Sequence, residues 1–345
     1  MSVSEHELPA HQQKPARLGK PAAALRPVGT GRPKISFVLP VFNEADNLSK
    51  LHAELCTAMD PVDCDLELIF VNDGSTDDSL PRLLALRDLD RRIVVLDLAR
   101  NYGQQVAITA GLDAATGNAV IVMDADLQDP PAVSVQLIDK WRQGYDVAYA
   151  QRRTRQDNWF KKATANIFYR LLHRLADVDI PRNTGDFRIL DRRVVEELKK
   201  FEEKDRFLRG MVSYVGFSQT AVPFDRPERY AGTSHYSLRK LVKVASDGFL
   251  GFSTFPLTLI SRVGYAVALL SVVGVLYVLV QKLFFPQLLV AGWAFIVISV
   301  LFVGGLQLIM LGLLGSYTGR IYRQVQNRPL YCLKGHHPAG TPEGR

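Results

Sequence analysis

Two long apolar stretches near the C-terminus constrain the fold of this chain more than any other feature. No Asp, Glu, Lys or Arg occurs from Val263 to Gln281, or from Leu283 to Gly319. Within them, 263–280 and roughly 289–314 each reach the ~20 apolar residues that a helix needs to cross a hydrocarbon core of ~30 Å. Two such runs in succession favour a pair of membrane-spanning helices over two buried helices of a soluble domain.

Basic residues flank this pair on one side only. Lys282 is the only charged residue in the connection 281–288. The basic residues on the other side are Arg239, Lys240, Lys243, Arg262, Arg320, Arg323 and Arg328. Because Lys and Arg concentrate in cytoplasmic loops, we expect a multi-pass protein of the inner (plasma) membrane. Its hairpin is predicted at 257–318, with both termini and a cytoplasmic tail at 319–345 on the cytoplasmic side.

The remaining sequence is that of a folded, charged protein. With 42 Lys+Arg, 35 Asp+Glu and 47% hydrophobic residues, wholesale disorder is excluded. Residues 1–33 carry no apolar run and are predicted to be a disordered basic tail, not a signal peptide. Cys56, Cys64 and Cys332 form no CxxC pair, which argues against a disulfide framework and a closed zinc site.

Short apolar runs alternate with helical patterns from Ile35 onward. Strands are expected at 35–41, 66–71, 93–98, 119–123 and 146–150. Helices are expected from Asn43, acting as N-cap, to Met59, and from about Asp77, Gly103 and Pro130. This alternation predicts an α/β domain at 34–235, with a mostly parallel, Rossmann-like sheet and helices on both faces.

Two further stretches, 157–175 and 238–250, are amphipathic and basic. Helices packed on the sheet and helices lying at the membrane surface both fit this pattern. The second stretch directly precedes the hairpin, so we expect 236–256 to be an interfacial segment. Its basic residues suit anionic lipid headgroups.

Acidic side chains follow two of the expected strands. Asp124-Ala125-Asp126 would present two carboxylates to one hard cation, Mg²⁺ or Mn²⁺, which could neutralise a diphosphate and help it to depart. Asp73 lies in an Asn-Asp-Gly-Ser turn, where a carboxylate can accept hydrogen bonds from a ribose or base edge. The chain contains neither GxGxxG nor GxxxxGK[ST], which counts against NAD-dependent enzymes and P-loop NTPases.

Taken together, these residues resemble a family 2 glycosyltransferase with a GT-A fold. The matching motifs are LPVFNE (39–44), VNDGSTDDS (71–79), RNYGQQVAITAGLDAATG (100–117), MDADLQDPP (123–131), GDFRIL (185–190), RFLRGMVSYVGF (206–217), RPERYAGTSHYS (226–237) and GLLGSYTGRIY (312–322). The resemblance extends from about Ile35 to Leu333. It is strongest to the polyisoprenyl-phosphate glycosyltransferases, which include GtrB-type glucosyltransferases and dolichyl-phosphate mannose synthases.

The resemblance implies inverting transfer of a sugar from a nucleotide-sugar to a polyprenyl phosphate, such as undecaprenyl phosphate, for modification of a cell-envelope glycan. UDP-glucose is the first expectation for the donor. GDP-mannose, UDP-N-acetylhexosamine and a UDP-aminoarabinose type of donor stay open. The expected partners are these two substrates and the membrane, with no nucleic acid; whether the protein forms a homo-oligomer is left open.

The resemblance also implies roles for individual residues. Those expected to bind the nucleotide-sugar are Pro40, Phe42, Glu44, Asp73 and Asp124, and those expected to bind a divalent cation and diphosphate are Asp124, Asp126 and Gln128. Those expected to bind the acceptor or a phosphate are Arg152, Arg153 and Tyr236, and Arg229 and Tyr236 are expected in a loop that closes over the site. Asp126 and Arg229 are expected to act in catalysis. Asp186 is the candidate base, although a phosphate acceptor with a second pKa near ~6 needs none, so Asp186 would then orient the sugar or acceptor.

Two other classes of protein share part of this pattern. A processive polysaccharide synthase would have the same acidic motif, but more spans and a QxxRW motif, which this sequence lacks. A non-catalytic membrane adaptor or flippase accessory would not need acidic residues at strand ends. Neither apolar run contains an acid or base that could line a translocation path.

Overall fold

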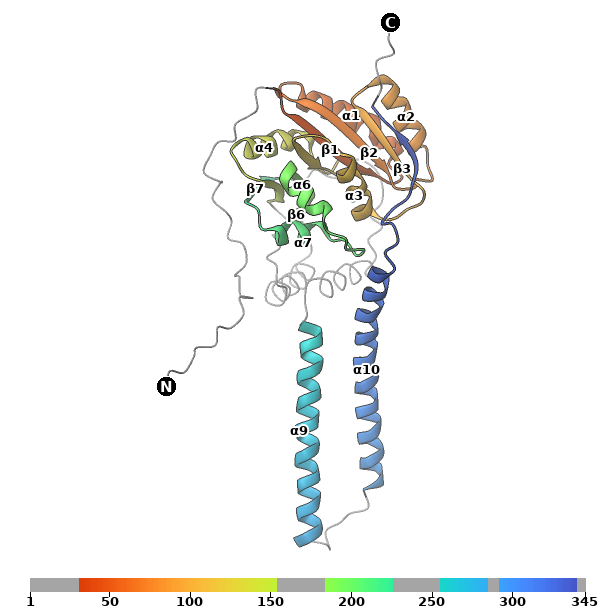
Figure 1. Ribbon diagram of the computed structural model, residues 1–345, viewed down its shortest axis with the longest axis vertical. Helices are drawn as coiled ribbons and strands as arrows, with labels where there is room; N and C mark the ends of the chain where they lie inside the picture. The colour runs from red at the N-terminus through yellow and green to blue at the C-terminus, as the bar shows by residue number, and fades with distance from the viewer. Residues whose placement is uncertain (1–30, 154–183, 226–254, 285–291, 340–345) are drawn as a thin grey trace, which may run out of the picture. The chain divides into compact units, whose positions relative to one another are not determined.

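A computed structural model of the chain describes residues 31–153, 184–225, 255–284 and 292–339 (Figure 1). These residues belong to two compact units. One contains 31–153, 184–225 and 329–339, and the other contains 255–284 and 292–328. The predicted amphipathic stretches at 157–175 and 238–250, and the predicted tail up to residue 30, lie outside the described residues.

The first unit is built on an eight-stranded sheet with the order β7-β5-β6-β4-β1-β2-β3-β8. The strands are β1 (Lys34–Val41), β2 (Asp65–Asn72), β3 (Ile93–Leu98), β4 (Ala119–Val122), β5 (Val147–Arg152), β6 (Thr184–Asp191), β7 (Gln219–Phe224) and β8 (Leu333–His337). Strand β1 is parallel to β2 and β4, β2 to β3, and β5 to β7. The pairs β4–β6, β5–β6 and β3–β8 are antiparallel. The prediction of a mostly parallel α/β sheet is therefore confirmed, with antiparallel additions.

Helices cover both faces of this sheet. They are α1 (Ala45–Met59), α2 (Ser79–Leu89), α3 (Gln104–Ala114), α4 (Pro131–Arg142), α6 (Arg192–Lys199) and α7 (Leu208–Val215). Helix α1 contacts α2 and α4 on one face, whereas α3 packs on β1 and β2 and contacts α6, which contacts α7. The Asn43 prediction was wrong: α1 begins at Ala45, and Asn43 has a left-handed backbone (φ 56°). Its side chain instead accepts a hydrogen bond from Thr76 N at 2.8 Å.

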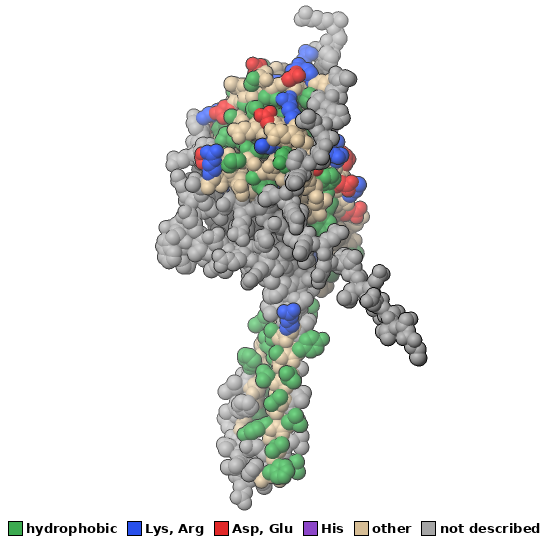
Figure 2. Space-filling view, turned by 90° about the vertical axis from the view of Figure 1, so that its left-hand side faces the viewer, with side chains coloured by type: hydrophobic (Ala, Val, Ile, Leu, Met, Phe, Trp, Pro, Cys, Tyr) green, Lys and Arg blue, Asp and Glu red, His purple; other side chains and the backbone are tan. Residues whose placement is uncertain are grey.

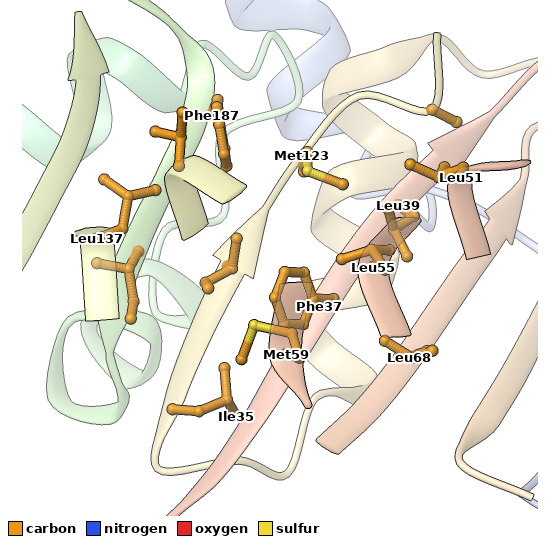
Figure 3. Close-up of a cluster of buried hydrophobic side chains, with 14 of the residues drawn as sticks. Ile35, Phe37, Leu39, Leu51, Leu55, Met59, Leu68, Met123, Leu137 and Phe187 are labelled. Atoms are coloured by element: carbon orange, nitrogen blue, oxygen red, sulfur yellow. The ribbon is translucent and has the colours of Figure 1, made fainter. Parts of the chain in front are cut away.

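The strands are buried on both sides because alternate side chains of β1 enter different layers. Ile35, Phe37 and Leu39 are fully buried in a cluster with residues of α1 (Figure 3). On the other face, a Cβ on Gly111 of α3 would lie 2.3 Å from Val38 Cγ1, so only glycine allows this close approach of helix and strand. Each large apolar side chain buried in this way contributes ~1.5–3 kcal/mol to folding.

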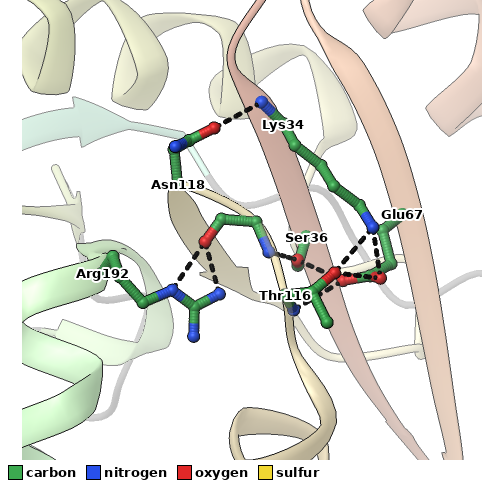
Figure 4. Close-up of polar contacts among 7 residues, drawn as sticks. Lys34, Ser36, Glu67, Thr116, Asn118 and Arg192 are labelled. Carbon is green, nitrogen blue, oxygen red and sulfur yellow. Dashed lines mark hydrogen bonds and ion pairs between the residues drawn. The ribbon is translucent and has the colours of Figure 1, made fainter.

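A polar network joins the beginning of β1 to β2 and to the turn before β4 (Figure 4). The buried carboxylate of Glu67 accepts hydrogen bonds from Lys34 Nζ (2.7 Å), Ser36 Oγ (2.5 Å) and both Oγ1 (2.6 Å) and N (2.9 Å) of Thr116. Burial alone would raise the pKa of Glu67, but these donors outweigh burial and hold its pKa below the ordinary value. The network therefore fixes the amino ends of β1 and β2 to the segment that leads into β4.

Strands β6, β7 and β8 were not in the predicted series, which ended at β5; β6 inserts between β4 and β5, and β7 and β8 form the two edges of the sheet. The C-terminal residues differ most from their prediction as a tail beginning at 319. Helix α10 (Trp293–Val325) continues six residues past 319, and β8 then pairs with the edge strand β3. Backbone hydrogen bonding explains the difference, because an unpaired edge strand offers N–H and C=O groups that a short returning segment can satisfy. Here Ala99 N donates to Cys332 O at 2.9 Å.

The second unit contains two long helices, α9 (Phe255–Phe284) and α10. Large apolar side chains are exposed along both, including Leu269, Leu270 and Leu276 of α9 and Leu308 and Ile309 of α10, and Figure 2 shows such side chains on the visible side of the helical part. Among the described residues, Phe302–Val325 is the one segment whose length and hydropathy suffice for a membrane span. The second span of the hairpin stays a prediction.

Candidate functional site

The polar end of the sheet forms where the strand directions bring four segments to one edge. Strands β1, β2 and β4 are mutually aligned, so their carboxyl ends meet there. Strand β6 is antiparallel to β4, with Arg188 opposite Val122, so the β6 end at this edge is its beginning. Asp124 follows the end of β4 and Asp186 lies near the beginning of β6, close enough for the negative charge of Asp186 to act on Asp124. The structure thus brings together two carboxylates that lie 62 positions apart in the sequence.

Four carboxylates influence one another at this edge. Burial raises the pKa of Asp124 well above its ordinary value, and the negative charges of Asp129, Asp186 and Asp126 raise it further. The turn is shaped by Gln128 N, which donates to Asp126 Oδ1 at 3.1 Å, and by a left-handed backbone at Leu127 (φ 60°). Oxygen ligands that repel one another when ionised are a donor set that fits a hard divalent cation.

Asp186 is only 4% exposed, yet its surroundings favour the ionised form. Burial would raise its pKa, but the charges of Arg209 and Arg188 and the hydrogen bonds from Arg209 and Gln105 lower it below the ordinary value. Arg209 Nε donates to Asp186 Oδ1 at 2.9 Å, and Gln105 Nε2 donates to Oδ2 at 3.0 Å. Asp124 and Asp186 therefore have pKa values shifted in opposite directions, a pattern typical of functional sites.

Asp73 holds the segment that leads into α3. Its Oδ1 accepts a hydrogen bond from Tyr102 N (2.7 Å) and its Oδ2 accepts one from Gly103 N (2.9 Å), and the residue is 3% exposed. Gly74 follows with φ +66°, and a Cβ there would lie 2.5 Å from the backbone of Arg100. Asp73 therefore shapes the site through the backbone. Its predicted contact with the nucleoside stays a prediction.

The residues after β1 are fastened to the residues after β2. Asn43 N donates to Ser75 Oγ and Glu44 N to Ser79 Oγ, each at 3.0 Å. Phe42 stays 45% exposed on this support, while Pro40 is partly buried at the end of β1. An exposed aromatic ring on a fixed loop is suited to stacking against a planar ligand. The predicted group Pro40, Phe42 and Glu44 thus lies at the same edge as the acidic cluster.

The predicted phosphate-binding arginines Arg152 and Arg153 have different surroundings. Arg152 ends β5, and its Nη2 lies 3.5 Å from the place that a Cβ on Gly185 would take, so it lies beside the beginning of β6. Arg153 is exposed and pairs with Asp225 at 3.3 Å. Arg229 and Tyr236 lie outside the described residues.

Four residues at this edge were not among the predicted site residues. Gln104 Nε2 donates to Asp124 Oδ1 at 2.6 Å, and Gln105 and Arg209 hold Asp186. Arg188 is 3% exposed, donates to Gly185 O at 2.9 Å, and has its pKa lowered to about 10 by burial, against the opposing charge of Asp186. All four lie inside motifs that carry the family resemblance, which was the signal that could have identified them.

Comparisons with known proteins found one matching family, several similar sequences and several solved structures. The family described as "Glycosyl transferase family 2" matches residues 36–199. The "Uncharacterized glycosyltransferase YkcC" of Bacillus subtilis is 46% identical over 303 residues, covering 87% of this chain and 93% of that protein. The "Bactoprenol glucosyl transferase" of Shigella phage SfII is 40% identical over 310 residues, covering 90% and 100%. A solved mannosyltransferase of Pyrobaculum calidifontis, in complex with GDP-Man and Mn²⁺, has a TM-score of 0.42 and 19% identity over 56% of each chain.

Proposed function

Because the chain belongs to glycosyltransferase family 2, we propose that it transfers a sugar from a nucleotide-sugar to a polyprenyl phosphate at the cytoplasmic membrane face. The observation that carries this proposal is the 40% identity to a bactoprenol glucosyl transferase along that protein's whole length. Glucose from UDP-glucose is accordingly the first donor to test. The exposed apolar surfaces of α9 and α10 support a lipid acceptor, since they are suited to contact with hydrocarbon.

In the proposed reaction, a phosphate oxygen of the acceptor attacks the anomeric carbon with inversion. The bond from that carbon to the diphosphate oxygen breaks, and the nucleoside diphosphate leaves with the electron pair. The acceptor phosphate is already anionic near neutral pH, because its second pKa is ~6. Asp186 need not remove a proton, and its pairing with Arg209 makes it a poor base. We therefore assign Asp186 to orienting the sugar or acceptor.

Asp124, Asp126 and Gln128 are the residues that would hold a divalent cation. Burial and the repulsion of neighbouring carboxylates raise the pKa of Asp124, and a cation would oppose both effects. A bound Mg²⁺ or Mn²⁺ would neutralise charge on the departing diphosphate. Arg152, which lies beside Gly185, would meet a phosphate near the same edge.

The experiment is a nucleotide-release assay on the purified full-length protein. We expect UDP to be released from UDP-glucose only when undecaprenyl phosphate is present, with one glucosyl lipid formed per UDP. Release accompanied by a growing glycan would instead indicate a processive synthase. No release from any of several UDP- or GDP-sugars, with this acceptor present, would contradict the proposal.

A further inference from the structure

Gln105 connects two parts of the site through its side-chain amide. It lies in the first turn of α3, where its Nε2 donates to Asp186 Oδ2 at 3.0 Å. Its Oε1 accepts a hydrogen bond from the backbone N–H of Leu208, the first residue of α7, at 2.8 Å. A backbone N–H can only donate and a carboxylate can only accept, so one orientation of the amide satisfies both partners.

The segment that carries Gln105 is itself held in place on both sides. Asp73 accepts hydrogen bonds from the N–H groups of Tyr102 and Gly103, which immediately precede α3. The next residue, Gln104, donates to Asp124 Oδ1 at 2.6 Å. Residues 102–105 therefore link carboxylates that come from the ends of three different strands, β2, β4 and β6.

The contact with Gln105 supplements the ion pair of Asp186 with Arg209. Arg209 Nε lies 2.9 Å from Oδ1, and its Nη2 lies 3.4 Å from Oδ2. Arg209 belongs to α7, and Gln105 belongs to α3, so the carboxylate is held from two helices. The two contacts from Arg209 attract and orient the carboxylate, and the donor from a second helix restricts its position further.

We propose that Gln105 is a positioning residue for sugar transfer: it fixes the carboxylate of Asp186 and the start of α7 relative to each other in the geometry that the reaction needs. This inference rests on the proposed function, since Asp186 is the group assigned there to orient the sugar or acceptor. Gln105 itself is not assigned a contact with either substrate.

Two substitutions test this role. Gln105→Glu preserves size and the acceptor facing Leu208 N–H, but it sets a second carboxylate against Asp186. Gln105→Met preserves length and removes both hydrogen bonds. We expect kcat to fall about 100-fold in each, because small displacements of an orienting group cost that much. We expect KM for the nucleotide-sugar to stay within about twofold, since the lost contact acts on the transition state.

Gln136→Glu is the matched control. It makes the same chemical change on α4, where Gln136 is exposed. It should retain the wild-type kcat and KM. A rise in KM with unchanged kcat in the Gln105 variants would overturn the proposal, as would equal losses in the control. Melting temperatures of all variants separate loss of positioning from loss of folding.

The position of Asp186 gives a readout that does not depend on activity. A crystal structure of Gln105→Met should show the Asp186 carboxylate turned away from the position it has in a crystal structure of the wild type. An unmoved carboxylate would overturn the proposal even if kcat fell. If the wild type transfers no sugar to a polyprenyl phosphate, the proposed function fails, and the crystallographic comparison still decides whether Gln105 positions Asp186.

Discussion

Asp124 and Asp186 are close enough for their charges to interact, yet their surroundings shift their pKa values in opposite directions. Asp186 has Arg209 as a direct partner, whereas Asp124 accepts its hydrogen bond from the neutral amide of Gln104. The charge of Arg209 therefore favours the ionised form of Asp186 without a metal ion. Asp124 is shifted towards its neutral form by burial and by three neighbouring carboxylates, and a bound cation would reverse this shift in its pKa.

This difference predicts a metal requirement. Chelation by EDTA should stop sugar transfer, and Mn²⁺ or Mg²⁺ should restore it. Asp126→Asn should lower kcat by about 100-fold or more, because it removes one charged ligand of the proposed cation. Asp139→Asn, an exposed change on α4, is the control and should behave as wild type. The assay is glucosyl-lipid formation at fixed free metal, and full activity in chelator would refute the assignment.

Glu67 provides a pH-dependent prediction for stability. Its folded-state pKa lies below the ordinary value of 4.5, so its ionised form stabilises the fold above that pH. The contribution is lost as the pH falls through the lower folded-state pKa. Glu67→Gln should cost about 1–3 kcal/mol at pH 7, because Lys34, Ser36 and Thr116 lose a charged acceptor that is itself buried. The difference in melting temperature from wild type should shrink in acid.

Glu54→Gln serves as the control for this experiment. Glu54 is exposed on α1, where it faces Lys50 at 3.9 Å. An exposed pair of this kind contributes little, so its melting temperature should match that of the wild type at each pH. If the melting temperature of Glu67→Gln were lower than that of the wild type by the same amount at every pH, the Glu67 carboxylate would act by packing alone.

At the scale of elements, the sequence predicted those strands and helices that follow a simple alternation. Strand β3 has the predicted bounds, and the other four predicted strands differ by one or two residues at one or both ends. Alternation does not reveal β6, which inserts between β4 and β5, because strand order depends on packing between distant segments. For the same reason Asp124 could be placed at a strand end, but its nearness to Asp186 could not be predicted.

Strand β8 was missed because it is short and polar, and its partner β3 lies more than 200 residues away. It is held beyond the strand pairing by Tyr331 Oη, which donates to Asp113 Oδ2 on α3 at 3.0 Å, and by Arg87 Nε, which donates to Pro338 O at 2.8 Å. These contacts join the C-terminal residues to two helices of the sheet domain.

Removal of β8 should therefore expose the edge of the sheet. A chain ending at Arg328 should show faster amide hydrogen exchange in β3, because its N–H groups facing β8 lose their acceptors. It should also aggregate more readily, since an unpaired edge strand templates pairing between chains. A chain ending at 339 keeps β8 and is the control. Unchanged exchange in β3 after removal of β8 would contradict this account of the edge.

At the scale of the whole molecule, helix length and charge predict where the ends of α9 and α10 would meet the surfaces of a membrane. With 30 and 33 residues, these helices are about 45 and 50 Å long, which exceeds a hydrocarbon core of about 30 Å. Their surplus length carries Arg262 near the start of α9 and Arg320 and Arg323 near the end of α10. In a hairpin, these three arginines lie at the same membrane face, where long basic side chains reach the headgroups.

This arrangement predicts that the connection between α9 and α10 faces away from the cytoplasm. Cys56, Cys64 and Cys332 are first replaced by Ser, because Cys332 is exposed and would react. In intact cells, Gln287→Cys in this background should be labelled by an impermeant thiol reagent. Gln287 lies outside the described residues, so this expectation rests on the charge pattern.

Ala132→Cys is the matched position for the opposite side, since Ala132 is exposed on α4 of the sheet domain. It should be labelled only after the cells are opened, because nucleotide-sugars and the proposed site belong to the cytoplasmic side. Protection of Gln287→Cys together with labelling of Ala132→Cys in intact cells would show that the topology is the reverse of the predicted one. The nucleotide-sugar would then have to reach the acidic cluster from outside the cell, which would also contradict the proposed reaction.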